Sequence, residues 1–91
     1  MKLSVEFKSI PHIYRDNHNN KTYRGFMFNG NNADILSEFG IDDYSIDGTT
    51  VTIDKYRLPK GYWIISAGLP DWFIVPNSYM TKMEVLVWWK V

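Results

Sequence analysis

The sequence predicts a small α+β protein, in which a mostly antiparallel β-sheet is curled or closed into a partial barrel and carries one short α-helix. Short segments rich in β-branched and aromatic residues alternate with turn sequences along most of the chain. The pair Asp47-Gly48 separates two such segments and is typical of a β-hairpin. The segments follow one another without the crossover helices that a parallel sheet requires, which favours antiparallel pairing.

The 91 residues form a single domain, 1–91, because this length leaves no room for a second core. Aromatic residues make up 16% of the chain, enough to stabilise a small core without disulfides. The absence of Cys excludes disulfides and thiolate metal sites. The first residues do not resemble a signal peptide, and no apolar run approaches the roughly 20 residues of a membrane span, so we expect a cytoplasmic protein.

At the start of the chain, alternation of apolar and polar residues over Lys2–Ile10 predicts a half-buried strand. Pro11 ends it, and the polar residues that follow make His12–Thr22 a loop or hairpin tip. Tyr23–Phe28 has the composition of a second strand. Gly25 inside it indicates a bulge or the close approach of another backbone.

The one convincing helix follows this strand. Asn31 or Asn32 can cap its start, Asp34 lies in the first turn, and Gly40 suits the left-handed residue that ends a helix. Because the helix spans only about two turns, its stability must come from packing on the sheet.

Two hairpins dominate the second half. Tyr44–Ile46 and Thr50–Ile53 flank Asp47-Gly48, where a type I′ turn would place both central residues at positive φ. The aromatic runs Tyr62–Ala67 and Trp72–Val75 then flank a Gly-Leu-Pro-Asp turn sequence.

The end of the chain predicts two more elements. After Pro76, Asn77 and Ser78 can cap a single helical turn that continues to Lys82. The final strand is expected at Glu84–Val91.

Several of these strands are apolar on both faces. Trp72 and Phe73 are adjacent, as are Trp88 and Trp89, so the members of each pair must point to opposite sides of a sheet. One short helix cannot cover both faces. We therefore expect the sheet to close on itself; the alternative is that one face meets a partner or a second copy of the chain.

A series of short motifs marks the chain between residues 26 and 80: Asn31-Asn32-Ala33-Asp34-Ile35, Pro59-Lys60-Gly61-Tyr62-Trp63-Ile64-Ile65, Gly68, Phe73-Ile74-Val75 and Pro76-Asn77-Ser78-Tyr79. Their order resembles that of a large group of short uncharacterised proteins encoded by tailed phages and prophages. The resemblance implies a phage or prophage accessory protein, but it carries no activity with it. The sequence departs from the group at Tyr62, where an acidic residue is usual, and in the strand before Pro76, which lacks the usual Cys.

Catalytic patterns are weak throughout. Ser66 and Ser78 lack a nucleophile-elbow context, and the six glycines are isolated turn residues without a phosphate-binding loop. The acidic groupings Asp42-Asp43 and Asp47 with Asp54 are typical of solvated turns. We therefore expect a protein that is not an enzyme and holds no cofactor.

The two histidines, His12 and His18, lie close together in the chain with Asp16 between them. Without Cys or a second cluster this is a weak metal pattern, and two solvated loop histidines are the favoured interpretation. The ten basic and ten acidic residues cancel, which disfavours nucleic-acid binding.

The aromatic residues are the remaining candidates for a site. We assign Trp63 and Phe73 to the core, and Trp72, Trp88 and Trp89, with the cations Arg57 and Lys60, to a partner-binding surface, because Trp and Arg are enriched at interaction hot spots. The leading hypothesis is a non-enzymatic phage protein that binds and inhibits a host protein of a defence or replication system. The alternatives are an oligomer that sequesters a nucleotide or other small molecule, and a self-associating accessory protein.

Overall fold

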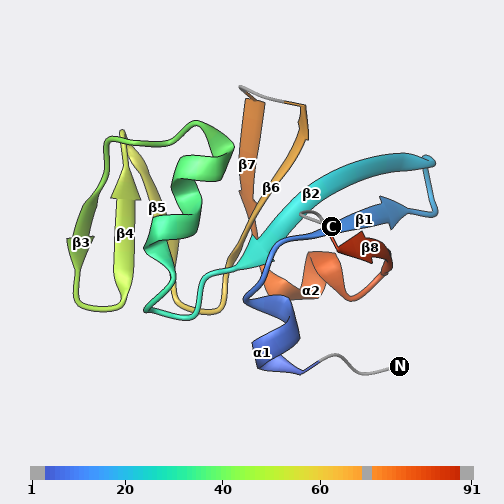
Figure 1. Ribbon diagram of the computed structural model, residues 1–91, viewed down its shortest axis with the longest axis horizontal. Helices are drawn as coiled ribbons and strands as arrows, with labels where there is room; N and C mark the ends of the chain where they lie inside the picture. Colours follow the sequence, from blue (N-terminus) through green and yellow to red (C-terminus); the bar gives the residue numbers. More distant parts are fainter. Residues whose placement is uncertain (1–3, 69–70, 89–91) are drawn as a thin grey trace.

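The computed structural model describes residues 4–68 and 71–88, which form two antiparallel sheets and three short helices (Figure 1). The strand order is β7-β6-β2-β1-β8 in the five-stranded sheet and β3-β4-β5 in the three-stranded sheet. None of the described helices is long and apolar enough to cross a membrane. The strands are β1 (His12–Asp16), β2 (Lys21–Met27), β3 (Ser45–Asp47), β4 (Thr50–Ile53), β5 (Tyr56–Pro59), β6 (Trp63–Gly68), β7 (Asp71–Val75) and β8 (Met83–Trp88). The helices are α1 (Val5–Lys8), the 3-10 helix η1 (Ala33–Phe39) and α2 (Asn77–Met80).

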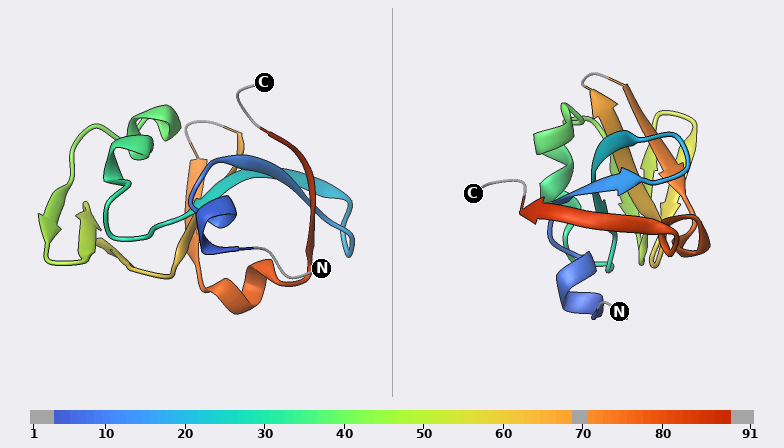
Figure 2. Two further views of the ribbon diagram at one scale, coloured as in Figure 1. Left: turned by 60° about the horizontal axis from the view of Figure 1, so that its bottom comes forward. Right: turned by 90° about the vertical axis from the view of Figure 1, so that its right-hand side faces the viewer.

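The mostly antiparallel α+β architecture is confirmed, but the expected closure into a partial barrel is wrong. The larger sheet is twisted and open, with β7 and β8 as its two edges among the described strands (Figure 2). Closure is unnecessary because other elements cover the sheet. The three-stranded sheet and η1 pack against one face, and α2 packs against the other.

The N-terminal segment is a helix and not the predicted strand. Ser4 caps α1 by accepting a hydrogen bond from the backbone N–H of Phe7 at 3.1 Å. The strand position beside β1 is taken by β8, so the N-terminal segment has no partner strand there. The alternating pattern had predicted a shared buried face, but Val5 is exposed and Phe7 is only half-buried.

The predicted loop His12–Thr22 is mostly strand. Residues 12–16 form β1, which pairs with β2 from His12 opposite Gly25 to Asp16 opposite Lys21. Only residues 17–20 make the hairpin tip. There the Asp16 carboxylate accepts from the His18 N–H at 2.9 Å, and Asn20 adopts a positive φ of 63°. The polar side chains bond to their own turn, as expected for Asx residues.

Gly25 allows β2 and β6 to approach closely, as its place inside a strand predicts. A Cβ at this position would lie 2.8 Å from the Ile65 Cγ2 atom and 3.2 Å from the Ile64 carbonyl oxygen. Both distances are shorter than ordinary van der Waals contact, so only glycine fits without displacing β6.

The predicted helix is confirmed, but it is a 3-10 helix, and Asn32 does not cap it through its side chain. The Asn32 amide nitrogen donates to the carbonyls of Ser9 and Met27 at 2.9 and 3.0 Å, and its Oδ1 accepts from the Asn29 N–H at 2.9 Å. This buried amide joins the N-terminal segment, the end of β2 and the start of η1. Gly40 ends the helix in the left-handed region, with φ of 75°, as expected.

The Asp-Gly hairpin forms, with its turn one residue later than the sequence indicates. Asp47 pairs with Thr50, so the central residues are Gly48 and Thr49. Of these two, only Gly48 has a positive φ, of 64°. A glycine at the first central position is the requirement of a type II′ turn and not of the predicted type I′ turn.

The aromatic hairpin predicted around Gly68 is confirmed as β6 and β7, which pair from Trp63 opposite Val75 to Gly68 opposite Asp71. The register shifts between Ile65 and Gly68, which marks a bulge. The buried Ser66 hydroxyl donates to the Asp71 carbonyl and accepts from the Gly68 N–H, so it satisfies backbone groups at this irregularity.

The C-terminal elements are both present. The predicted helical turn is α2, although Asn77 lies inside it and not at its cap. The predicted last strand is β8, which pairs antiparallel with β1. Its predicted residues 89–91 lie outside the described part of the chain.

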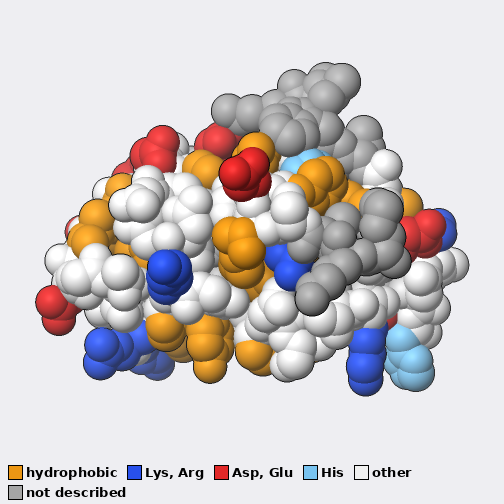
Figure 3. Space-filling model, turned by 90° about the horizontal axis from the view of Figure 1, so that it is seen from below, with side chains coloured by type: hydrophobic (Ala, Val, Ile, Leu, Met, Phe, Trp, Pro, Cys, Tyr) orange, Lys and Arg blue, Asp and Glu red, His pale blue; other side chains and the backbone are white. Residues whose placement is uncertain are grey.

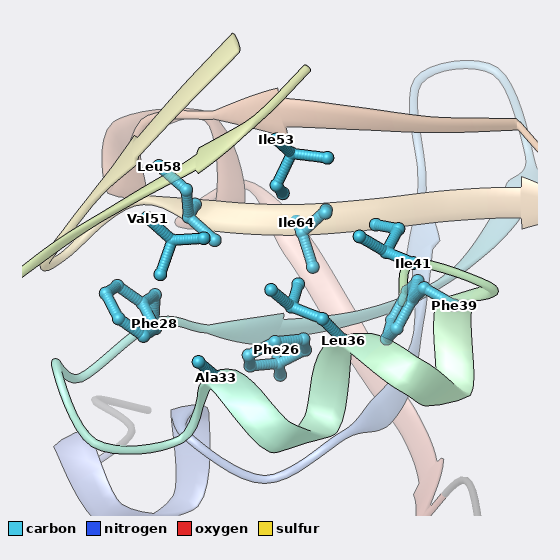
Figure 4. Close-up of a cluster of buried hydrophobic side chains, with 10 residues drawn as sticks. All are labelled: Phe26, Phe28, Ala33, Leu36, Phe39, Ile41, Val51, Ile53, Leu58 and Ile64. Atoms are coloured by element: carbon cyan, nitrogen blue, oxygen red, sulfur yellow. The ribbon is translucent and has the colours of Figure 1, made fainter. Parts of the chain in front are cut away.

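Two clusters of buried side chains form the core, one on each face of the larger sheet. The first lies between this sheet, η1 and the three-stranded sheet (Figure 4). Alternation along β6 sends Ile64 into the first cluster and Trp63 and Ile65 into the second. The first cluster contains Phe26, Phe28, Ala33, Leu36, Phe39, Ile41, Val51, Ile53, Leu58 and Ile64. The second contains Tyr14, Met27, Trp63, Ile65 and Met80.

Candidate functional site

Of the residues predicted to bind a partner, Trp72 is in β7. Its side chain is half-buried against the first cluster, and its ring meets that of Tyr56 edge-on, with centroids 5.6 Å apart. Arg57 lies in β5 and Lys60 directly after it, and both are exposed. Trp72 and Arg57 therefore belong to neighbouring elements, β7 and β5.

The structure does not bring the predicted tryptophans together. Trp88 ends β8, opposite His12 of β1, and its side chain is not among those described. Trp89 lies outside the described residues. Trp72 and Trp88 are on the two edges of the larger sheet, with β6, β2 and β1 between them.

Phe73 is not a core residue, contrary to its assignment from the sequence, whereas Trp63 is. Trp63 is buried in the second cluster, and its indole N–H donates to the Asn77 side-chain oxygen at 2.9 Å. The Phe73 side chain is 55% exposed. Because β7 is an edge strand, nothing described covers Phe73 from the outer side.

Three hollows lined by described residues lie along the β7 side of the molecule. The largest, of about 790 Å³, lies between the β1–β2 tip and the segment around α2. A second, of about 330 Å³, and a third, of about 440 Å³, lie beside β7. Tyr79 lines the first and the second, while Phe73 and Ile74 line the second and the third. The hollows therefore adjoin one another from the hairpin tip to β5.

We call the lining aromatic residues the β7 surface: Tyr23, Tyr56, Trp72, Phe73 and Tyr79. They come from four elements, β2, β5, β7 and α2, and the tertiary structure brings β2 and β5 beside the consecutive elements β7 and α2. Seen from below, the molecule shows several separate hydrophobic patches, one of them on a border with Lys or Arg side chains beside it (Figure 3). Of this set, the sequence pattern indicated only Trp72 as a binding residue. Adjacency to Trp72 in an edge strand would have indicated Phe73, but the tyrosines gave no comparable signal.

Charges lie at the ends of the β7 surface. Asp16 and Lys82 are among the lining residues of the largest hollow. Asp71 lines the third hollow, at the β5 side of the β7 surface. Lys55 lies near the same hollow, because its ammonium group is 5.6 Å from the centre of the Tyr56 ring. The second hollow, between these ends, has no charged residue in its lining.

The Tyr79 hydroxyl stays neutral at physiological pH. Burial, followed by the nearby Tyr23 and Asp16, raises the pKa of Tyr79 above its usual value of 10.0. A neutral hydroxyl next to a carboxylate can donate a hydrogen bond. Tyr79 therefore offers a ligand both an aromatic ring and a polar group.

The expectation of two solvated loop histidines is wrong for His12. His12 is buried in β1, where its ring stacks on Phe7 with centroids 3.8 Å apart. His18 is exposed at the hairpin tip, as expected. Among the described residues, no group of three His, Asp or Glu side chains is placed to hold a metal ion.

The acidic residues grouped in the sequence lie outside the linings of the three hollows. Asp42 and Asp43 are exposed between η1 and β3, Asp47 flanks the β3–β4 turn, and Asp54 lies in the β4–β5 turn with a positive φ of 56°. The Tyr14 hydroxyl is buried without a hydrogen-bond partner among the described atoms, and burial raises the pKa of Tyr14. Tyr14 lines none of the three hollows described above.

No protein-family model, no curated protein and no solved structure matches this chain.

Proposed function

We propose that this protein is a non-enzymatic binding protein, encoded by a phage or prophage, that occupies a host protein in the host cytoplasm through the β7 surface. The observation that carries the proposal is the series of adjoining, aromatic-lined hollows along an edge of β7 with which none of the described strands pairs. Exposed Tyr side chains beside a half-buried Trp, as at this edge, are typical of interaction hot spots. The phage origin rests on the sequence resemblance alone.

Affinity purification from the host tests the proposal. The tagged full chain is expected to recover one host protein in stoichiometric amount, and Tyr79→Ala is expected to weaken that binding at least tenfold, or about 1.4 kcal/mol. Tyr62→Ala is the matched control, because Tyr62 is about as exposed as Tyr79, at 41% against 43%, but lines none of the three hollows. Equal binding by both variants would exclude the β7 surface as the binding site.

A nucleotide or other small molecule is the second candidate ligand. The largest hollow, of about 790 Å³, lies within the range of ligand pockets and has both Lys82 and Tyr79 in its lining. The base of a nucleotide bound there would stack on the Tyr79 ring, and the Lys82 ammonium group would neutralise a phosphate charge. The expected result is a rise in melting temperature with a nucleotide panel, abolished by Lys82→Ala; an unchanged melting temperature throughout the panel would rule this candidate out.

Self-association is the third candidate. Gel filtration with light scattering over a range of protein concentrations measures it directly. A strict monomer would remove both self-association and any ligand held between subunits.

A further inference from the structure

Residues 72–75 on the outer edge of β7 carry no charged side chain and no proline, two of the features that usually prevent strand pairing. An edge strand exposes a row of backbone N–H and C=O groups, and proteins commonly protect it with charged side chains, proline or a bulge. Glu84 lies inside β8, at the other edge of the same sheet, and forms an exposed ion pair with Arg15. In β7 the only charged residue is Asp71, at the first position, and residues 72–75 are all apolar.

Hollows flank β7 on both of its faces. Trp72 and Ile74 pack on the first cluster, and Val75 packs on the second. The hollow with Tyr56 in its lining contains Trp72, and the hollow with Tyr23 and Tyr79 contains Val75. Side chains of an added strand would alternate between these two hollows, because successive residues of a strand point to opposite faces.

The geometry favours a single extended segment as the occupant. The Tyr56 ring, in contact with Trp72, brings the three-stranded sheet close to the β7 edge (Figure 1). This arrangement leaves less space for the whole sheet of a second copy than for one strand. Pro76 follows β7 and has no N–H to donate, so pairing is limited to about the length of β7.

The charges define the chemistry of the segment. The second hollow has an uncharged lining, so a charged side chain placed there would lose its hydration without gaining a partner. Asp71 is exposed at the start of β7 and lines the third hollow, where it would attract a basic residue. A matching segment therefore has apolar side chains at alternate positions, an uncharged centre, and Lys or Arg at the end beside Asp71.

We propose that β7 is a docking edge at which an extended, apolar segment of a partner protein, with a basic residue next to Asp71, adds a further strand to the larger sheet. This inference rests on the proposed function, since it specifies how the β7 surface binds. Main-chain hydrogen bonds supply affinity in such strand addition, and the side-chain pockets supply specificity.

A random-sequence peptide display library, selected against the full chain, provides the probe. We expect the selected peptides to alternate apolar residues around an uncharged centre, with Lys or Arg at one end. Phe73→Lys is expected to weaken their binding at least tenfold, because it places a charge at the middle of the edge. Leu86→Lys is the matched control, because Leu86 is also an exposed apolar residue, at 43%, in the strand at the opposite edge.

Amide hydrogen exchange with a selected peptide distinguishes the mode of binding. Strand addition is expected to slow exchange of amides in residues 71–75 at least tenfold, with those of β8 unchanged. Binding that is lost in Phe73→Lys without slower exchange would overturn strand addition and leave the proposed function standing. Failure to select any peptide sensitive to Phe73→Lys, or a dimer that Phe73→Lys converts to a monomer, would also overturn it.

The host-protein purification with Tyr79→Ala tests the proposed function separately. If binding of the host protein is weakened by Tyr79→Ala but does not slow amide hydrogen exchange in residues 71–75, the proposed function is supported and strand addition is rejected. Recovery of no host protein rejects the function itself.

Discussion

His12 couples the N-terminal helix to the sheet through a ring stack with Phe7. Its Nδ1 atom lies 2.7 Å from the Ile10 carbonyl oxygen, and its ring meets that of Tyr14 edge-on. Burial lowers the pKa of His12, while the hydrogen bond to Ile10 opposes this shift only in part. A proton on His12 is therefore less favourable in the folded state than in the unfolded chain.

Stability is expected to fall on acidification below about pH 6.5, where His12 of the unfolded chain begins to bind a proton that the folded state resists. Above that pH the contribution of His12 is fully present. A single group changes the free energy of unfolding by at most about 1.4 kcal/mol per pH unit. Urea unfolding at several pH values between 5 and 8 measures the effect.

His12→Phe preserves an aromatic ring against Phe7 and is expected to flatten this pH dependence. His18→Gln, at the exposed hairpin tip, is the control and is expected to keep the fall seen in the unaltered protein. If His18→Gln removed the fall and His12→Phe did not, burial of His12 would not be its cause.

At the scale of single elements, the pairing of β2 with β6 depends on Gly25. Gly25→Ala is expected to lower the free energy of unfolding by about 1–3 kcal/mol, because the new methyl group would meet the Ile65 side chain and the Ile64 carbonyl. Urea or thermal unfolding of the variant checks this value.

Gly68→Ala is the matched control for Gly25→Ala. Gly68 also lies in a strand of the larger sheet, but a Cβ there meets no atom within 4 Å, and its φ is not positive. The expected effect is within about 0.5 kcal/mol of zero. Similar losses in both variants would show that strand glycines in general, and not the close contact, determine the cost.

At the scale of the whole molecule, the larger sheet has apolar residues on both faces, and other elements cover both of them. Strands β2 and β6 contribute to both clusters through alternate residues, as Phe26 and Met27 do in β2. One face packs on η1 and the three-stranded sheet, and the other on the Met80 side of α2. The two sheets should therefore unfold together, since they share the first cluster.

Ile64→Ala tests this coupling at a fully buried position of the first cluster. The expected loss is about 2–5 kcal/mol, and the three-stranded sheet should lose amide protection in the same transition as the larger sheet. Ile46→Ala, at an exposed β3 position, should change stability by less than about 0.5 kcal/mol. Separate transitions for the two sheets would contradict shared packing.

The sequence alone was sufficient for the elements whose signals are local. Gly40 ends its helix, Gly48 makes a hairpin, and the hairpin around Gly68 follows from two aromatic runs on either side of a turn. Each signal depends on the conformational freedom of one glycine or on a few neighbouring residues. The alternation of apolar and polar residues near the N-terminus wrongly predicted a strand. The same residues form the short helix α1, and the ring of its Phe7 stacks on His12 of β1.

Only the tertiary structure decided whether the sheet is open or closed, which aromatic residues are covered, and where a binding surface forms. Trp63 and Phe73 have similar local sequence settings, yet one is buried and the other exposed, because β6 lies inside the sheet and β7 at its edge. The β7 surface joins residues of β2, β5, β7 and α2, of which only β7 and α2 are consecutive in the chain. Local sequence specifies turns and alternation, but burial depends on which strand comes to lie next to which, and that is a property of the whole fold.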